Sequence, residues 1–327
     1  MTNGWIDIKN TDMMLIMGGN PAENHPCGFK WAVEAKIHRN AKTIVVDPRL
    51  TRTAANADMY VQIRAGADIA FLGGVIRYAI ENNRIAKDYL VNYTNAAFII
   101  KDGFNLPEDG LFSGFDPEKK VYDKKTWNYE EGGDLAGKPV AATPPEKAPP
   151  LPAGATPPPP VLPPKTAFDL SLQHPRCVYQ LLKKQYERYT PEMVERITGI
   201  PKDQFLKAAD LFTSVRKDGD MKKVATIIYA VGWTQHSFGT QIIRTAAVLQ
   251  LLMGNVGRAG GGVNALRGHS NIQGATDMAG IFDILPGYLK MPNPADVDLA
   301  TFLKRTTPTA SKPDPWESFN YWSNTPK

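Results

Sequence analysis

Short apolar runs that end at glycine, asparagine or aspartate are the feature that most constrains the fold of this chain. The first covers residues 13–17 and stops at 18–20, and the others cover 43–46, 60–63 and 224–230. Their apolar residues are continuous rather than alternating, which is typical of parallel strands buried on both faces. Amphipathic segments separate the runs. This alternation predicts an α/β fold with a parallel sheet and helices on both faces.

The segments between and after these strands show helical spacing of apolar residues. Helices are predicted at 23–39, 69–82, 178–189, 191–197, 201–215 and 239–253. Asp68 is a suitable N-cap for the second of them. Strands and helices alternate both before and after a proline-rich stretch, which favours one Rossmann-like, dinucleotide-binding domain that contains an insertion.

The regular pattern breaks between residues 101 and 165. Residues 139–165 hold twelve prolines, a composition typical of polyproline II or irregular chain. A docking segment for a proline-binding partner is one interpretation, but a tolerated surface insertion is favoured because long loops add little closure entropy. We therefore expect one domain made of 1–100 and 166–264, an insertion at 101–165, and a partial second domain at 265–327.

Composition argues against several classes of protein. The 327 residues carry a formal net charge of +5 without a lysine or arginine block, so nucleic-acid binding is not expected. Cys27 and Cys177 form no CxxC motif, and neither a zinc site nor an iron–sulfur cluster can be built from them alone. No residue of this chain is expected to ligate a metal. No apolar run reaches about 18 residues, so no membrane-spanning segment is expected.

The ends of the predicted strands indicate a nucleotide site. Glycine lets the backbone approach a ligand closely, and ligands of α/β proteins bind at the carboxyl ends of the strands. An aspartate there suits ribose hydroxyls or guanine N–H groups. Each residue alone is as typical of an ordinary turn or cap, but four such ends in order favour a site. The candidates are Gly18, Gly19, Asn20, Asp47, Arg49, Gly66, Asp68, Val231 and Gln235. The GxGxxG fingerprint is absent, which argues against an NAD-dependent dehydrogenase.

A second polar cluster follows the glycine-rich turn at 257–262. Arg267, His269, Asn271 and Gln273 lie close together in sequence with little apolar packing between them. A guanidinium binds a carboxylate through two parallel hydrogen bonds, so Arg267 is a candidate anion receptor. His269 taken alone is more typical of a structural histidine. The cluster predicts a pocket for a polar, anionic ligand.

Taken together, these segments resemble the catalytic subunit of molybdenum- or tungsten-dependent formate dehydrogenases, which are molybdopterin oxidoreductases. The resemblance rests on the motifs at 17–26, 46–54, 64–70, 232–236 and 261–274. The last motif is highly specific and points to formate dehydrogenase rather than to nitrate or dimethyl sulfoxide reductases. The resemblance runs along the chain from Trp5 to about Lys327, except for the proline-rich insert.

The resemblance implies a bis(molybdopterin guanine dinucleotide) cofactor with molybdenum or tungsten. By match, one dinucleotide would be held by Gly18, Gly19, Asn20, Asp47, Arg49, Gly66, Asp68 and Gln235. Arg267 would hold the formate carboxylate, with Gln273 and His269 as further catalytic candidates and Asn271 facing the cofactor. The implied reaction is oxidation of formate to carbon dioxide, with electrons passing to an iron–sulfur chain.

The resemblance also implies partners and a location. An iron–sulfur (beta) subunit and a membrane cytochrome subunit are the expected partners. Residues 93–95, 110–114 and 172–177 look like the periplasmic, membrane-associated branch that serves anaerobic respiration. The family's N-terminal cysteines for a 4Fe-4S cluster and its metal-ligating selenocysteine or cysteine have no counterpart here. We therefore expect a middle fragment that is inactive alone. The alternative is a non-catalytic nucleotide- or molybdopterin-binding module, or a subunit of a split enzyme.

Overall fold

The computed structural model describes residues 3–106, 113–131, 166–266, 284–285 and 289–306. They belong to two compact units, residues 1–266 and 267–327. The second unit contains a short hairpin of β8 (Ile284–Leu285) and β9 (Leu289–Lys290), and the helix α11 (Leu299–Thr306). The domain limits expected from the sequence stay a prediction, and the proline-rich stretch lies outside the described residues.

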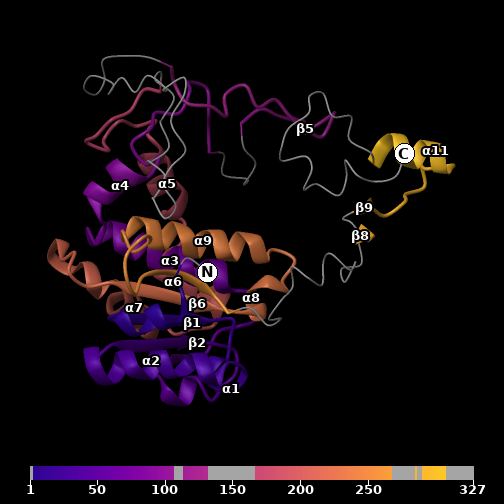
Figure 1. The fold of residues 1–327 in the computed structure, drawn as a ribbon. Coiled ribbons are helices and arrows are strands. Elements are labelled where there is room, and N and C mark those ends of the chain that lie inside the picture. Colours follow the sequence, from indigo (N-terminus) through magenta and orange to yellow (C-terminus); the bar gives the residue numbers. More distant parts are fainter. Residues whose placement is uncertain (1–2, 107–112, 132–165, 267–283, 286–288, 307–327) are drawn as a thin grey trace, which may run out of the picture. The chain divides into compact units, whose positions relative to one another are not determined.

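A sheet of five parallel strands forms the centre of the first unit (Figure 1). The strands are β1 (Met13–Met17), β2 (Lys42–Val46), β3 (Met59–Val61), β6 (Ala225–Tyr229) and β7 (Gly262–Ala265). Their order in the sheet is β3-β2-β1-β6-β7, so the direction of winding reverses between β1 and β6. In open α/β sheets this reversal leaves a crevice at the carboxyl ends of the strands. The predicted α/β fold with a parallel sheet is confirmed.

Helices cover both faces of this sheet (Figure 1). The helix α2 (Pro26–Arg39) and the 3-10 helix η1 (Trp5–Asn10) pack together on one face. The other face carries α3 (Asp68–Glu81), α7 (Lys202–Thr213) and α9 (Gly239–Leu252). Because both faces are covered, the side chains of β1 and β6 are buried along their whole length.

The packing of β1 explains why its sequence is continuously apolar. Met14 and Ile16 join the core shared with α2, whereas Met13, Leu15 and Met17 join the core shared with α3 and α9. Successive side chains of a strand point to opposite faces. All five side chains of β1 are therefore buried, each with at most 2% of its surface exposed.

Shorter elements connect the layers. They are α1 (Pro21–Asn24), η2 (Ala54–Asn56), α4 (Lys87–Tyr93), α5 (Val178–Tyr186), α6 (Pro191–Thr198), η3 (Ser214–Gly219) and α8 (Val231–Thr234). A small antiparallel hairpin of β4 (Phe115–Asp116) and β5 (Val121–Tyr122) lies within the expected insertion. Among the described helices, none is both long and apolar enough to cross a membrane.

Two local predictions from the sequence were wrong, and one strand was not predicted. The helix predicted at 23–39 is divided into α1 and α2 at His25, because Pro26 keeps the residue before it out of the helical region. The strand β7 was not predicted, since it begins in a glycine-rich turn that carries little strand signal. Asp68 does not cap α3. It is the first residue of the helix, and Ala67 occupies the capping position without a side-chain hydrogen bond.

A fully buried arginine joins η3 to the loop that precedes β7. Arg216 Nε donates to the Met253 carbonyl at 2.5 Å, and Nη1 donates to the Lys223 carbonyl at 2.7 Å. Its Nη2 donates to Asn255 Oδ1 at 2.6 Å. Burial lowers the pKa of Arg216 to about 10, with the charge of Arg258 adding to the effect. The guanidinium is thus held mainly by neutral oxygen acceptors.

Replacing Arg216 with alanine is expected to lower the free energy of unfolding by about 3 kcal/mol or more, because several buried oxygens lose their donor. Urea denaturation of the 327-residue chain measures this. Arg258→Ala removes a half-buried arginine that donates to the Lys223 and Met221 carbonyls at the surface, and it is expected to cost no more than about 1 kcal/mol. Equal losses in the two variants would contradict the role of the buried guanidinium.

Candidate functional site

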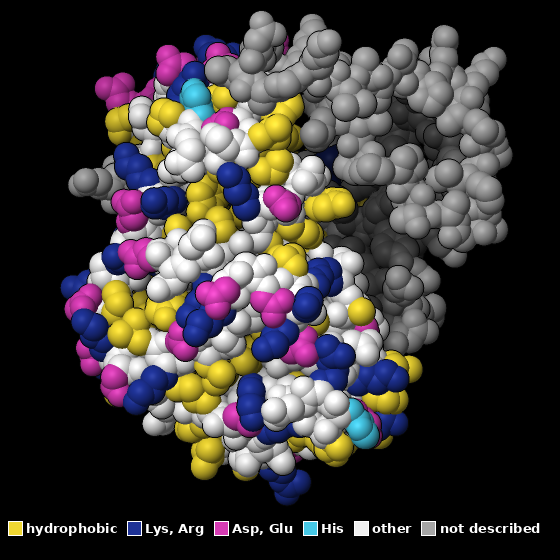
Figure 2. Space-filling view, turned by 90° about the vertical axis from the view of Figure 1, so that its left-hand side faces the viewer, with side chains coloured by type: hydrophobic (Ala, Val, Ile, Leu, Met, Phe, Trp, Pro, Cys, Tyr) yellow, Lys and Arg dark blue, Asp and Glu magenta, His cyan; other side chains and the backbone are white. Residues whose placement is uncertain are grey.

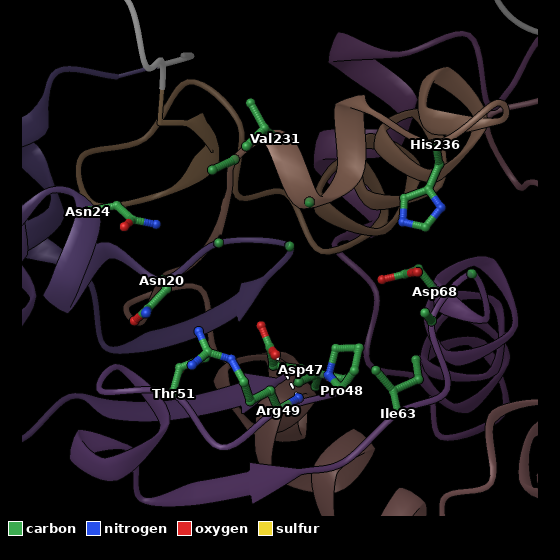
Figure 3. A pocket seen from close by; sticks show the side chains of 17 residues that line it. Asn20, Asn24, Asp47, Pro48, Arg49, Thr51, Ile63, Asp68, Val231 and His236 are labelled. Atoms are coloured by element: carbon green, nitrogen blue, oxygen red, sulfur yellow. Dashed lines mark hydrogen bonds between the residues drawn. The ribbon is translucent and has the colours of Figure 1, made fainter.

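A pocket opens where the sheet reverses its winding, at the carboxyl ends of β1, β2 and β6 (Figure 3). Its volume is about 270 Å³. The segment that follows β3 and the start of α3 complete its wall. The lining residues are Gly18, Gly19, Asn20, Asn24, Val46, Asp47, Pro48, Arg49, Thr51, Ile63, Ala65, Gly66, Asp68, Ala230, Val231, Gly232 and His236.

The structure brings most of the sequence-predicted residues to this one place. Every described candidate except Gln235 lines the pocket. Gln235 is exposed at the end of α8, where its backbone N–H donates to the Val231 carbonyl at 3.0 Å. The candidates Arg267, His269, Asn271 and Gln273 lie outside the described residues. The binding roles expected for all of these residues stay predictions.

Two glycines allow β1 and β6 to meet at the floor of the pocket. Gly18 has a φ of +64°, and its carbonyl accepts from the backbone N–H of Ala230 at 3.1 Å and of Gly232 at 2.9 Å. A Cβ on Gly232 would lie 2.7 Å from the Gly18 carbonyl oxygen. Real Cβ atoms do not approach this closely, so both positions require glycine.

Asn20 lines the pocket, but its side chain is engaged by the protein. Its Oδ1 accepts from Thr53 Oγ1 at 2.8 Å and from the Thr53 backbone N–H at 3.2 Å. Its Nδ2 donates to Glu23 Oε2 at 2.7 Å. The amide therefore holds the loop after β2 against the end of β1, and it shapes the pocket wall.

Asp47 follows β2 and presents a half-buried carboxylate at the pocket wall. The backbone N–H of Arg49 donates to Asp47 Oδ1 at 2.8 Å, which fixes the orientation of the side chain. The Tyr60 hydroxyl donates to the Asp47 carbonyl at 3.1 Å and ties this turn to β3. The Arg49 side chain is exposed on the same turn, so it supplies positive charge beside the pocket.

Asp68 supplies a second carboxylate from the start of α3, and it is only 7% exposed. Trp233 Nε1 donates to Asp68 Oδ1 at 2.9 Å. Burial raises the pKa of Asp68, and the nearby Asp47 charge adds to this, whereas the Trp233 hydrogen bond and the His236 charge oppose it. Figure 3 shows the carboxylate directed into the pocket beneath the His236 ring.

Several lining residues were not singled out from the sequence. Thr51 and His236 lie within the motifs at 46–54 and 232–236, so the motifs marked their neighbourhood but not their place in the pocket. Within the described ranges, no three His, Cys, Asp or Glu side chains are grouped so that they could hold a metal ion. Cys27 and Cys177 are both unpaired as thiols. The pocket thus offers glycine backbone, two carboxylates, a histidine and an arginine.

On the face shown in Figure 2, basic and acidic side chains are interspersed. No large area of that face carries charge of a single sign. The ionisable residues that line the candidate site are Asp47, Arg49, Asp68 and His236.

Asp68 is expected to make stability depend on pH. Its pKa is raised in the folded chain, so the folded state holds the proton more tightly than the unfolded state, whose carboxyl has a pKa near 3.8. The resulting stabilisation is present below pH 3.8 and is lost as the pH rises through the folded pKa. Urea denaturation at several pH values should show that wild type loses stability relative to Asp68→Asn over this window. The raised pKa of Asp68 would be contradicted if the stability of wild type relative to Asp68→Asn stayed constant or increased with pH.

Comparisons with known proteins found a matching family and several similar sequences. The family described as "Molybdopterin oxidoreductase" matches residues 1–314. The nitrate-inducible formate dehydrogenase major subunit of Escherichia coli is 49% identical over all 327 residues, and the formate dehydrogenase-O major subunit of the same organism is 48% identical. The formate dehydrogenase subunit alpha of Megalodesulfovibrio gigas is 44% identical. The chain spans 29% of the length of each of these relatives.

Among solved structures, acetylene hydratase from Pelobacter acetylenicus matches 77% of this chain and 24% of that chain, with 17% identity and a TM-score of 0.43. The family match covers nearly the whole sequence, and the resemblance read from the motifs is confirmed at this level. The chain belongs to the molybdopterin oxidoreductase family.

Proposed function

We propose that this chain is the part of a formate dehydrogenase catalytic subunit that binds one guanine dinucleotide of a bis(molybdopterin guanine dinucleotide) cofactor. The family implies a molybdopterin that carries molybdenum or tungsten. The similarity to formate dehydrogenase major subunits supports the choice of enzyme. The observation that carries the proposal is the pocket at the reversal of the sheet, where the strand ends bring glycine backbone, Asp47 and Asp68 together.

The chemistry of the pocket suits a guanine nucleotide. Guanine presents adjacent N–H donors along one edge, and ionised carboxylates are acceptors only. Asp47 lies at the end of β2 and Asp68 at the start of α3, so the two acceptors come from separate elements of the wall. The Arg49 side chain is exposed on the same turn as Asp47 and is suited to phosphate oxygens. Gly18, Gly19 and Gly66 line the same wall and present their backbone to a ligand.

The redox step belongs to the cofactor, whose metal centre would accept the electrons of formate when bound. The part proposed for this chain is to orient the substrate. Arg267 would pair with the formate carboxylate and stabilise charge as the C–H bond breaks. Gln273 and His269 would line the same place, and Asn271 would face the cofactor. These four roles rest on the sequence resemblance alone, since the residues lie outside the described ranges.

The proposal extends to the assembly. The implied partners are an iron–sulfur subunit and a membrane cytochrome subunit, in a periplasmic location. A 4Fe-4S cluster in another part of the catalytic subunit would carry electrons away from the metal centre. Similarity to the nitrate-inducible and cytochrome c-553 formate dehydrogenase subunits supports a respiratory role.

Binding of guanosine monophosphate to the 327-residue chain tests the nucleotide role. Asp47→Asn and Asp68→Asn are each expected to weaken the affinity about 10-fold or more at pH 7, because a charged acceptor for a guanine N–H group is lost. Isothermal titration calorimetry measures the affinities. Glu81→Gln is the matched control, since Glu81 ends the helix that Asp68 begins and lies about 20 Å away along it.

Adenosine monophosphate separates base recognition from phosphate binding in the same experiment. It keeps the ribose and phosphate but replaces the paired donors of guanine with a donor beside an acceptor. We expect its affinity to be weaker and insensitive to Asp68→Asn. Equal affinities for the two nucleotides, or equal effects of Asp68→Asn and Glu81→Gln, would contradict guanine recognition at this pocket.

A further inference from the structure

Trp233 is buried at the point where three elements of the pocket meet. None of its surface is exposed, and its ring stacks on Tyr229 at the end of β6, with centroids 5.0 Å apart and planes inclined by 25°. A Cβ on Gly18 would lie 2.6 Å from the indole Cδ1. The glycine at the end of β1 therefore makes room for this ring.

The indole reaches across the end of β1 to the start of α3. Its Nε1–H donates to Asp68 Oδ1 at 2.9 Å, and both groups are buried. An indole N–H is a donor only, so it pairs with an acceptor oxygen. Trp233 does not line the pocket, whereas Asp68 does. The indole therefore contacts the Asp68 carboxylate on the side away from the pocket.

We propose that Trp233 is a positioning residue that holds Asp68 by its Oδ1 oxygen, so that Oδ2 faces the pocket as an ionised acceptor for an N–H or O–H group of the ligand. This inference rests on the proposed nucleotide function for the identity of the ligand. The role assigned to Trp233 itself concerns only this chain, and it is measurable without any ligand.

The surroundings of Asp68 oppose its ionisation, so a fixed hydrogen-bond donor is needed to stabilise the carboxylate. Burial disfavours its ionised form, and so does the charge of Asp47 from the end of β2. Three groups act in the opposite direction: the Trp233 indole, the backbone N–H of Asp68 itself and His236, which follows α8. Of these, Trp233 is the buried side chain whose donor is fixed by stacking, so it holds the direction of the carboxylate and favours its ionised form.

The direct test is an NMR titration of the ligand-free 327-residue chain. In wild type, the Trp233 indole N–H resonance should move with pH at the same midpoint as the Asp68 carboxyl carbon. In Trp233→Phe, the Asp68 midpoint should shift to higher pH, because an aromatic ring remains but the indole N–H donor is lost. Trp31→Phe is the control, since it removes a half-buried indole on α2, where Lys9 and Lys30 lie over its ring, and it should leave the Asp68 midpoint unchanged.

The same variants are then tested for binding guanosine monophosphate. Trp233→Phe should weaken the affinity about 10-fold at pH 7, and the loss of binding at low pH should begin at a higher pH than in wild type. An indole resonance that does not follow Asp68, or an unchanged Asp68 midpoint in Trp233→Phe, would overturn the inference. If Trp233→Phe does not fold, the wild-type titration alone decides. Coupled titration without any binding of the nucleotide by wild type would support the role of Trp233 and contradict the proposed function.

Discussion

The pocket depends on the close approach of two strand ends, β1 and β6, at the centre of the sheet. Gly18 turns the chain with a φ of +64°, and the Gly232 backbone lies where any Cβ would meet the Gly18 carbonyl. Trp233 then fills the remaining space above Gly18 and is held there by Asp68. The strand order reverses here, so this contact lies where open α/β sheets bind their ligands.

In the pocket, burial opposes the ionisation of a carboxylate. Asp47 and Asp68 both line the pocket, and burial raises the pKa of Asp68. Two carboxylates that face one cavity favour a ligand with hydrogen-bond donors, because such a ligand satisfies both acceptors and separates their charges. The exposed arginine on the Asp47 turn provides the opposite charge that phosphate groups require. The same wall therefore offers acceptors for a base and a cation for its phosphates.

Much of this arrangement follows from sequence because parallel strands place their carboxyl ends at one edge. Residues as far apart as Gly18, Asp47 and Val231 could be assigned to one site on that ground. Local chemistry also shows why some predictions failed. Pro26 divides a helix that apolar spacing alone would join, and β7 begins at glycines that resemble a turn. The hydrogen bond between Trp233 and Asp68 joins residues 165 positions apart. No local pattern could therefore show that Asp68 accepts from the Trp233 indole instead of capping α3.

The most direct measurement is a crystal structure of the 327-residue chain grown with guanosine diphosphate. The account predicts the guanine ring in the pocket between Asp47 and Asp68, with its phosphates on the side of Arg49. Guanosine diphosphate bound elsewhere, for example in the groove lined by Gln62, Arg64 and Gln204, or a pocket without nucleotide at saturating concentration, would contradict the central claim.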